Sequence, residues 1–397
     1  MFADSCAVWY QRRKSVFKDL EFLIVGAGFA GTVLAQQIAS VLKRKVILID
    51  KHPHPGGASA AGTDPETGIE YHKYGSHIFH TSFQDVWDYI TRFTSFNNYR
   101  HQVFVNTQGR IYNLPVNLKT VNDFYGLNLR PDEMEIFLQK EREGKKTETC
   151  SNLEEKAIRL VGEKLYRAFF CNYTTKQWGR PPRELPPDII ARLPVRTNYD
   201  CNYFSDPFQG IPRQGYQHLF SRLLDHPLIS FLGGVSFTEI RSQLPRHCKI
   251  FYSGNLDELF RYRFGPLSWR SLRFEWKKVP VHDFQGTAVM NYADLEIPYT
   301  RIHEFKHYHT EHQEIVRQNK TLLCYEYPLE YHPGMEAFYP TGTPEDLKKY
   351  ECYKALALRE GIRPIGRLGS YRYWNMDQTI RNSLVVFRQL QKELGYD

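Results

Sequence analysis

Three glycines, Gly26, Gly28 and Gly31, follow directly on the apolar run 22–25, and Asp50 ends the next apolar run. In a strand–turn–helix–strand unit, the first glycine permits a tight turn and the second lets backbone approach a pyrophosphate. The third glycine lets the helix pack closely against the strand, and the acid is placed to bond a ribose hydroxyl. This spacing predicts a binding site for a dinucleotide.

Residues next to these glycines complete the expected cofactor contacts. Phe29 and Ala30 begin the helix, whose free N–H groups and positive dipole end face the phosphates. Lys51 follows the acid, and a proline- and glycine-rich loop then leads to Gly57 and Ala58. The glycine pair in that loop allows close approach of the backbone to a ligand.

The strands and helices that must position this site can be predicted near both ends of the chain. We expect strands over 22–25 and 46–49, with a helix from Phe29 between them. Near the other end, a strand and tight turn over 364–369 precede a helix capped by Asn375. A further strand over 249–254 also ends in a turn typical of a nucleotide-binding domain, so this domain is expected to be discontinuous.

The middle of the chain contains two regions with different patterns of hydrophobic residues. From 81 to 191 the pattern is mostly helical, and the clearest helix begins at Ser151-Asn152 and carries Phe169 at its end. We expect Tyr173, Thr174 and Trp178 in the loop that follows this helix. From 192 to 340, short aromatic and β-branched runs between turns predict sheet strands over 271–276, 287–292 and 321–326.

Composition limits the classes of partner and compartment. The 397 residues carry a net charge of +8 without a basic tail or nucleic-acid motif, which favours an anionic small molecule over DNA or RNA. Seven cysteines without a Cys-x-x-Cys pair indicate a reducing, cytoplasmic setting. No apolar run reaches the roughly 20 residues that span a bilayer. The first 18 residues read as a loose extension.

Two groups of histidines raise the question of a metal site. His72, His77 and His80 form one group, and 303–312 contains four more histidines. Neither group has cysteine or acid partners at the spacing typical of zinc sites. We therefore predict no metal, and we expect the second group to lie on a solvated strand and loop.

Several longer phrases resemble bacterial UDP-galactopyranose mutase. They occur in the order of that family and cover residues from about 20 to 390. The most specific are His72-Lys73-Tyr74-Gly75-Ser76-His77-Ile78-Phe79-His80-Thr81, Tyr173-Thr174-Thr175-Lys176-Gln177-Trp178-Gly179, Asn202-Tyr203-Phe204-Ser205-Asp206 and Gly366-Arg367-Leu368. One departure is Ala58, where the family commonly has asparagine, and another is Gln214, where it commonly has glycine.

The resemblance implies an α/β fold with three parts. These are a discontinuous Rossmann-like FAD-binding domain (19–85, 207–258 and 345–397), a helical domain (86–190) and an antiparallel β-sheet domain (191–206 and 259–344), after the extension 1–18. The reaction it implies interconverts UDP-galactopyranose and UDP-galactofuranose, with N5 of the reduced flavin attacking the anomeric carbon. A homo-oligomer and a reductant such as NAD(P)H are further expectations.

Site residues follow from the same resemblance. The residues expected to act on the diphosphate and in catalysis are Arg192, Arg301, Arg367, Tyr373 and His77, with Tyr203 and Tyr339 as further diphosphate ligands. A uridine and sugar wall is expected from Phe169, Tyr173, Thr174 and Trp178, with His101 and Asn291 as additional contacts. The flavin is expected to contact Gly26, Gly28, Phe29, Ala30, Gly31, Asp50, Lys51, Gly57, Ala58, His77, Ile78, Gly366, Arg367, Met376 and Asp377.

Other functions share parts of this pattern. An amine-oxidase-like flavin oxidoreductase has the same glycine fingerprint but no need of an arginine pair for a diphosphate. A non-catalytic UDP-sugar-binding flavoprotein would retain the pocket without the isomerisation. Within the family, an N-acetylated galactose is an alternative substrate, and Phe169 is equally consistent with a helix core.

Overall fold

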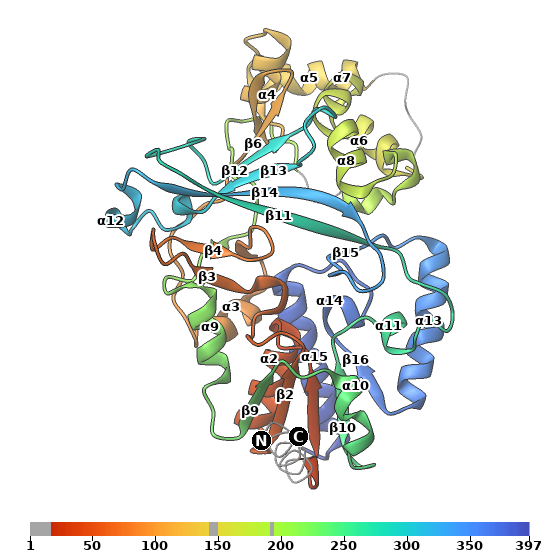
Figure 1. Cartoon of the computed structure of the whole chain (residues 1–397). Coiled ribbons are helices and arrows are strands. Elements are labelled where there is room, and N and C mark those ends of the chain that lie inside the picture. The colour runs from red at the N-terminus through yellow and green to blue at the C-terminus, as the bar shows by residue number, and fades with distance from the viewer. Residues whose placement is uncertain (1–16, 143–149, 191–193, 397) are drawn as a thin grey trace.

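A parallel five-stranded sheet forms the base of the molecule (Figure 1), and the computed structural model describes residues 17–142, 150–190 and 194–396. Its strand order is β16-β10-β1-β2-β9, and every neighbouring pair is parallel. The strands are β1 (Phe22–Val25), β2 (Val46–Asp50), β9 (Ile229–Gly233), β10 (Lys249–Tyr252) and β16 (Ile362–Pro364). Strands from three distant segments share one sheet, so the expectation of a discontinuous Rossmann-like unit is confirmed.

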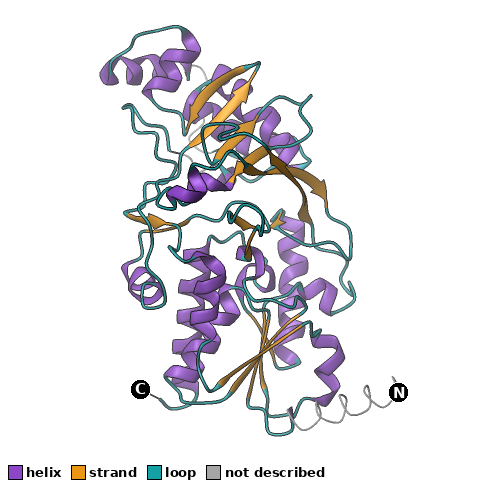
Figure 2. Cartoon of the chain, turned by 60° about the vertical axis from the view of Figure 1, so that its left-hand side comes forward, coloured by secondary structure: helices purple, strands orange, loops and turns teal. Residues whose placement is uncertain are grey.

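Helices cover both faces of this sheet because its strands are apolar on both sides (Figure 2). Phe22 and Ile24 of β1 pack in one core with α2 (Phe29–Ser40) and α15 (Met376–Glu393). Leu23 and Val25 face the other core, with α13 (Pro344–Arg359). The alternation follows from the two-residue period of a strand. The expected cap of α15 at Asn375 is confirmed, and Gln378 completes a capping box with it.

A seven-stranded sheet crosses above the parallel sheet. Its order is β15-β11-β14-β13-β12-β6-β7, and its pairs are antiparallel except β12 with β6. The strands are β6 (Val103–Thr107), β7 (Arg110–Leu114), β11 (Trp269–Val279), β12 (Val289–Tyr292), β13 (Arg301–Glu304), β14 (Thr321–Glu330) and β15 (Tyr339–Pro340). This sheet carries residues of the site on β12, β13, β14 and β15.

The strands β6 and β7 correct the sequence analysis, which read 81–191 as mostly helical. Val103, Val105 and Thr107 are buried and alternate with more exposed residues, as in a strand with one buried face. The hairpin turns at Gln108 and Gly109, both of which have positive φ. Pairing of β6 with the distant β12 completes the sheet.

The helical segments lie at the far end of the seven-stranded sheet (Figure 1). They are α4 (Leu118–Tyr125), α5 (Pro131–Glu141), α6 (Leu153–Val161), α7 (Glu163–Leu165), a π-helical turn (Tyr166–Cys171) and α8 (Asn172–Trp178). The helix expected from Leu153 to Phe169 is interrupted at Gly162, whose φ is +83°. The chain then winds on to Trp178, so the prediction that Tyr173, Thr174 and Trp178 lie in a loop is wrong.

The remaining elements connect these layers. Short strands pair as β3 with β4 and β5 with β8. Their bounds and those of the other helices are β3 (Ala61–Thr63), β4 (Glu70–His72), β5 (Phe79–Thr81), β8 (Phe208–Gly210), α3 (Gln84–Ile90), α9 (Gly215–Leu224), α10 (Phe237–Ile240), α11 (Leu256–Leu259), α12 (Gln313–Val316) and α14 (Gly366–Gly369). In the described ranges, no helix combines the length and the apolar character needed to cross a membrane.

Candidate active site

Two cavities meet between the parallel sheet and the seven-stranded sheet. The smaller, of about 330 Å³, is lined by the β1–α2 turn, the end of β2 and the loop around Gly57. The larger, of about 620 Å³, is lined by the helical segments and the seven-stranded sheet. Six residues line both cavities: Ala58, Tyr74, His77, Phe338, Arg367 and Met376. A long ligand in the smaller cavity can therefore present one end to the larger one.

The glycines of the smaller cavity have the geometry that their spacing predicts. Gly26 has a φ of +98°, and a Cβ on Gly31 would lie 2.0 Å from the carbonyl oxygen of Gly26. Gly57 has a φ of +53°, and its own Cβ would lie 2.9 Å from Cα of Gly28. The two glycine turns thus lie back to back, which leaves bare backbone at the floor of the cavity.

Asp50 lies at the end of β2, where it lines the smaller cavity and is 6% exposed. Its carboxylate accepts hydrogen bonds from the backbone N–H groups of Ala27 (2.7 Å) and His52 (2.8 Å). The acid therefore fixes the first glycine turn as well as facing the cavity. Carboxylate oxygens can accept further bonds, so these contacts leave capacity for a ribose hydroxyl.

Glu336 covers the same end of the cavity and was not predicted. Its carboxylate lies 2.8 Å from Lys51 Nζ and 3.3 Å from His52 Nε2. The hydrogen bond from His52 and the nearby Lys51 ammonium hold the pKa of Glu336 at about 2, against the effect of its burial. Lys51 thus joins this edge of the parallel sheet to the loop before β15.

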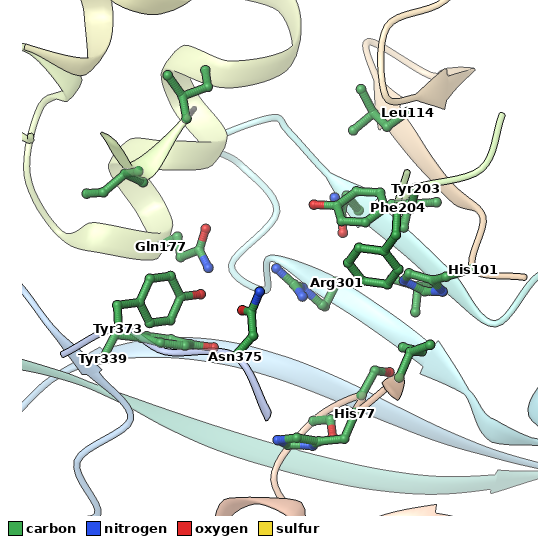
Figure 3. A pocket seen from close by; sticks show the side chains of 18 of the residues that line it. His77, His101, Leu114, Gln177, Tyr203, Phe204, Arg301, Tyr339, Tyr373 and Asn375 are labelled. Atoms are coloured by element: carbon green, nitrogen blue, oxygen red, sulfur yellow. The ribbon is translucent and has the colours of Figure 1, made fainter. Parts of the chain in front are cut away.

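Polar side chains converge in the larger cavity from several elements (Figure 3). Arg301 and Asn375 point toward one another in the middle, with Tyr339 and Tyr373 on one side of them. His77 and a second aromatic group, formed by His101, Tyr203 and Phe204, complete the surroundings. The lining combines aromatic faces with a few converging polar groups, as small-molecule sites do.

Arg301 is the principal charged group of this cavity. Its Nε lies 3.4 Å from Glu326, which faces it in register on β14, and its Nη2 donates to the phenol of Tyr173. Burial opposes the charge of Glu326, yet Arg301 and the hydrogen bond from His303 lower the pKa of that carboxyl to about 2. The partly exposed guanidinium of Arg301 thus compensates the charge of the buried Glu326 carboxylate.

Arg367, Tyr373 and Tyr339 lie together at the junction of the cavities. Arg367 donates to the carbonyl oxygen of Trp374 through Nε (3.0 Å) and Nη2 (2.7 Å), and to Phe338 O (3.3 Å). Its guanidinium carbon is 5.3 Å from the ring centre of Tyr373. Arg367 therefore fixes the backbone that carries Tyr373 and Met376.

A second aromatic group lies at the other side of the larger cavity. His101 is 5% exposed, and its ring lies against Phe204 and against the edge of Tyr203. Burial lowers the pKa of His101 to about 3, so its ring is neutral. Nearby Asn291 on β12 is buried, and no group among the described residues hydrogen-bonds its Oδ1. That oxygen is available to a ligand.

Helix α8 contributes one wall of the larger cavity, through Tyr173, Thr174, Gln177 and Trp178. Lys176 on the same helix holds it against the loop before β13. Its ammonium donates to the carbonyl oxygens of Tyr292 (2.7 Å), Asp294 (2.8 Å), Ile297 (2.9 Å) and Tyr299 (3.1 Å). The helix and the strand that carries Arg301 are thus joined by one side chain.

Several other predicted site residues depart in part from their expected places. Asp377 is 6% exposed and does not line either cavity, and Ile78 lines only the larger one. Phe169 is 1% exposed and belongs to the core beside Tyr112, although it also lines the larger cavity. Arg192 falls in 191–193, outside the described residues.

The histidines after 300 correct the expectation of a solvated group. His303 is fully buried and His309 is 7% exposed. Carboxylates that are distant in sequence pair with both: Glu326 Oε2 lies 3.1 Å from His303 Nε2, and Glu70 Oε2 lies 2.8 Å from His309 Nε2. A sequence pattern cannot reveal such partners, because they come from other strands.

Sequence reasoning missed several lining residues. Gln177 and Phe204 lie within phrases that the resemblance singled out, so neighbouring positions carried the only signal. Asn375 was recognised as a helix cap and also points into the larger cavity. Ser76 lies within the phrase 72–81, but the partners of its side chain, His303 and Tyr308, come from a distant part of the chain. Glu326 had no local signal of a role in the site, because that role depends on strands that meet only in the folded chain.

Comparisons with known proteins agree on one family. The family model for UDP-galactopyranose mutase matches residues 168–373, and a model for NAD(P)-binding Rossmann-like domains matches residues 24–93. The chain is 39% identical to a probable UDP-galactopyranose mutase of Klebsiella pneumoniae, with 91% of this chain and 92% of that protein covered. It is also 39% identical to a dTDP-fucopyranose mutase of Escherichia coli, covering 91% of this chain and 96% of that protein.

A solved structure shares the fold of this chain. A crystal structure of reduced UDP-galactopyranose mutase superposes with a TM-score of 0.73 at 17% identity, covering 94% of this chain and 96% of that one. A UDP-galactopyranose mutase of Mycoplasma pneumoniae is 31% identical, covering 94% of this chain and 97% of that protein. The chain belongs to the UDP-galactopyranose mutase family.

Proposed function

We propose that this enzyme interconverts UDP-galactopyranose and UDP-galactofuranose with FAD as its cofactor, active when reduced. Membership of the mutase family supports isomerisation, and the Rossmann-like unit together with the family implies a flavin. The observation that carries the proposal is the position of Arg301, in a large cavity that meets the dinucleotide cavity.

The residues present fit an FAD molecule. Bare backbone at Gly28 and Gly57 leaves room for a pyrophosphate, and Asp50 faces the cavity where a ribose is expected. The residues shared by both cavities, including His77 and Met376, would then surround the flavin ring. The first turn of α15 at Met376 can direct its positive dipole end to the electron-rich edge of that ring.

A reduced flavin supplies N5 as a nucleophile toward the anomeric carbon of the sugar. The chain's own residues would bind the sugar nucleotide and orient it. Arg301 keeps its charge at every relevant pH and would grip the departing diphosphate, with Arg192 as a second ligand on the strength of the resemblance. The phenols of Tyr173, Tyr203, Tyr339 and Tyr373 would add donors without adding charge, and Trp178 and Phe169 would form the nucleoside wall.

His77 would face the reacting end of the flavin. Its Nδ1–H donates to the carbonyl oxygen of Gly75 at 2.7 Å, so Nε2 carries no proton in the neutral ring. Burial lowers the pKa of His77 to about 4, which keeps the ring neutral at pH 7. His77 would therefore act as a hydrogen-bond acceptor and not as a cation.

The E. coli relative provides a second candidate substrate, because it acts on dTDP-fucopyranose at the same 39% identity. Both nucleotides present a diphosphate to Arg301, and they differ in the base and in the sugar. The test is to incubate the dithionite-reduced, FAD-loaded enzyme with UDP-galactofuranose and, in parallel, with dTDP-fucopyranose. Chromatography of the products should show UDP-galactopyranose in the first reaction. Conversion of the fucose nucleotide alone would reassign the substrate.

We also propose that the enzyme is cytoplasmic and that a dihydronicotinamide reduces its flavin. The described cysteines are all free thiols, which supports a reducing cytoplasm. A dihydronicotinamide such as NAD(P)H is the expected source of electrons for the flavin. Bleaching of the yellow enzyme by NADPH or NADH under argon would support that source, and an unchanged spectrum would exclude it.

A further inference from the structure

The loop at the junction of the two cavities is tied to the buried side of β13. Ser76 lies between Gly75 and His77 in this loop, and its Oγ hydrogen-bonds His303 Nδ1 and the phenol of Tyr308. His303 and Tyr308 are both fully buried or nearly so. The loop that would face the flavin therefore has a polar connection to the interior of the seven-stranded sheet.

His303 continues this connection toward the substrate side. It lies two residues after Arg301 on β13, so the two side chains project from the same face of the strand. Glu326 stands opposite Arg301 in register on β14. Its Oε2 lies 3.1 Å from His303 Nε2, and its Oε1 lies 3.4 Å from Arg301 Nε.

The chemistry of the groups fixes the direction of each hydrogen bond. A carboxylate only accepts, so His303 donates Nε2–H to Glu326. In a neutral imidazole, Nδ1 is then an acceptor, and the hydroxyl of Ser76 donates to it. Ser76 Oγ in turn accepts from the phenol of Tyr308. One arrangement satisfies every group, from Tyr308 through Ser76 and His303 to Glu326.

We propose that Ser76 and His303 are positioning residues that couple the junction loop to Arg301 through Glu326. This inference rests on the proposed function, in which the loop faces the flavin and Arg301 binds the diphosphate. A movement of the loop that breaks the Ser76–His303 bond leaves a buried ring nitrogen without its donor. Glu326 and Arg301 then lose the fixed imidazole against which they are oriented. The position of the loop on the cofactor side and the orientation of Arg301 on the diphosphate side thus depend on each other.

The first test measures binding of UDP to the oxidised, FAD-loaded enzyme by calorimetric titration. Ser76→Ala removes the donor and should raise the Kd for UDP about tenfold, although the hydrogen bonds of Ser76 Oγ go to His303 and Tyr308 and not to Arg301. Ser76→Thr keeps the hydroxyl and should restore most of the affinity. Ser383→Ala is the matched control, because Ser383 is buried, lines neither cavity and donates to a backbone oxygen within α15.

The second readout distinguishes coupling from a simple loss of structure. In the wild type, UDP should perturb the flavin absorption spectrum, and in Ser76→Ala this perturbation should be reduced at saturating UDP while the melting temperature matches that of Ser383→Ala. In a double-mutant cycle, Ser76→Ala should add little to the effect of His303→Phe, because both break the same chain.

The outcomes separate this inference from the function on which it rests. If the wild-type enzyme binds UDP and isomerises the sugar, but Ser76→Ala binds UDP as tightly and perturbs the flavin equally, the coupling is refuted. Effects of Ser76→Ala and His303→Phe that multiply in the double variant refute it as well. A wild-type holoenzyme without affinity for UDP would overturn the proposed function and the coupling together.

Discussion

Arg301 donates from Nη2 to the phenol of Tyr173, and this contact joins β13 to α8 across the larger cavity. The guanidinium is held from behind by Glu326 at 3.4 Å, so its remaining donors are directed at the space where a substrate would lie. The charged fork is the guanidinium of Arg301 on β13, and Tyr173 on the distant helix α8 helps to orient it. A planar fork of this kind suits a diphosphate better than a single point charge does.

Replacing Arg301 should therefore abolish substrate binding without removing the cofactor. We expect Arg301→Lys to lower kcat/KM on the order of 100-fold, because an ammonium keeps the charge but loses the paired donors. Arg301→Ala should be nearly inactive and still yellow, and Arg192→Ala is expected to behave likewise. Steady-state kinetics and the flavin absorbance check this. Arg273→Ala on the exposed face of β11 is the control, and unimpaired turnover in Arg301→Lys would contradict the role.

Lys176 should be needed for substrate affinity, although it acts through other residues. Its ammonium satisfies four carbonyl oxygens and fixes α8 against the loop that leads to Arg301. Lys176→Met leaves those oxygens unpaired and should cost about 2 kcal/mol of stability or more. The same variant should raise KM for the sugar nucleotide about tenfold, which steady-state kinetics and thermal melting would reveal.

A matched variant separates the two effects of Lys176. Lys306 also donates to three backbone oxygens, those of His282, Gln318 and Lys320, but it lines neither cavity. Lys306→Met should lower the melting temperature and leave KM unchanged. An equal rise of KM in both variants would show that general destabilisation explains the result.

Gly28 should control cofactor loading without controlling the fold. A Cβ at this position would meet Cα of Gly57 at 3.7 Å, which is an ordinary contact, but it would occupy the floor of the dinucleotide cavity. Gly28→Ala should fold and bind FAD at least ~10-fold more weakly, because the pyrophosphate needs the bare backbone. Gly31→Ala should not fold, since its Cβ would lie 2.0 Å from Gly26 O. A fully yellow Gly28→Ala protein would count against this placement.

His101 should make stability depend on pH in a defined direction. Its folded pKa is about 3 and its unfolded pKa is about 6.5, so between these values only the unfolded chain binds the proton. Stability is therefore complete above pH 6.5 and is lost as the pH falls toward 3. From pH 7.5 to 5 the loss attributable to His101 is about 2 kcal/mol.

His101→Phe isolates this contribution, because it keeps a ring against Phe204 and removes the titration. Urea unfolding at pH 7.5 and 5 should show a smaller loss of stability in the variant than in the wild type. Groups common to both proteins cancel in the difference. The same pH dependence in the two proteins would mean that His101 does not remain neutral in the folded state.

The nucleotide-binding unit could be predicted from sequence because its determinants are local. Gly26, Gly31 and Asp50 act within one strand–turn–helix–strand segment: sterics require the two glycines, and Asp50 accepts a hydrogen bond from Ala27 in the same segment. The cap of α15 at Asn375 is local in the same sense. Arg301 and Tyr173 entered the predicted site through their sequence context, and the fold brings them into contact.

The errors arose where tertiary contacts decide. Strand β6 pairs with β12 far along the chain, and its alternating pattern was overlooked within a helical region. Gly162 breaks the helix before Tyr166, and a π-helical turn followed by α8 carries the chain on to Trp178. His303 and Glu326 form a buried pair only because β13 and β14 are neighbours. Residue spacing in the sequence does not indicate the pairing of β6 with β12 or the contact of His303 with Glu326.

The most direct test of the central claim is product analysis with reduced enzyme. The purified chain, loaded with FAD and reduced by dithionite under argon, is incubated with UDP-galactofuranose, and the nucleotide sugars are separated by chromatography over time. The account predicts a yellow protein that converts the furanose to UDP-galactopyranose when reduced and not when oxidised. A chain that stays colourless in excess FAD, or that leaves the furanose form unchanged when reduced, would contradict it.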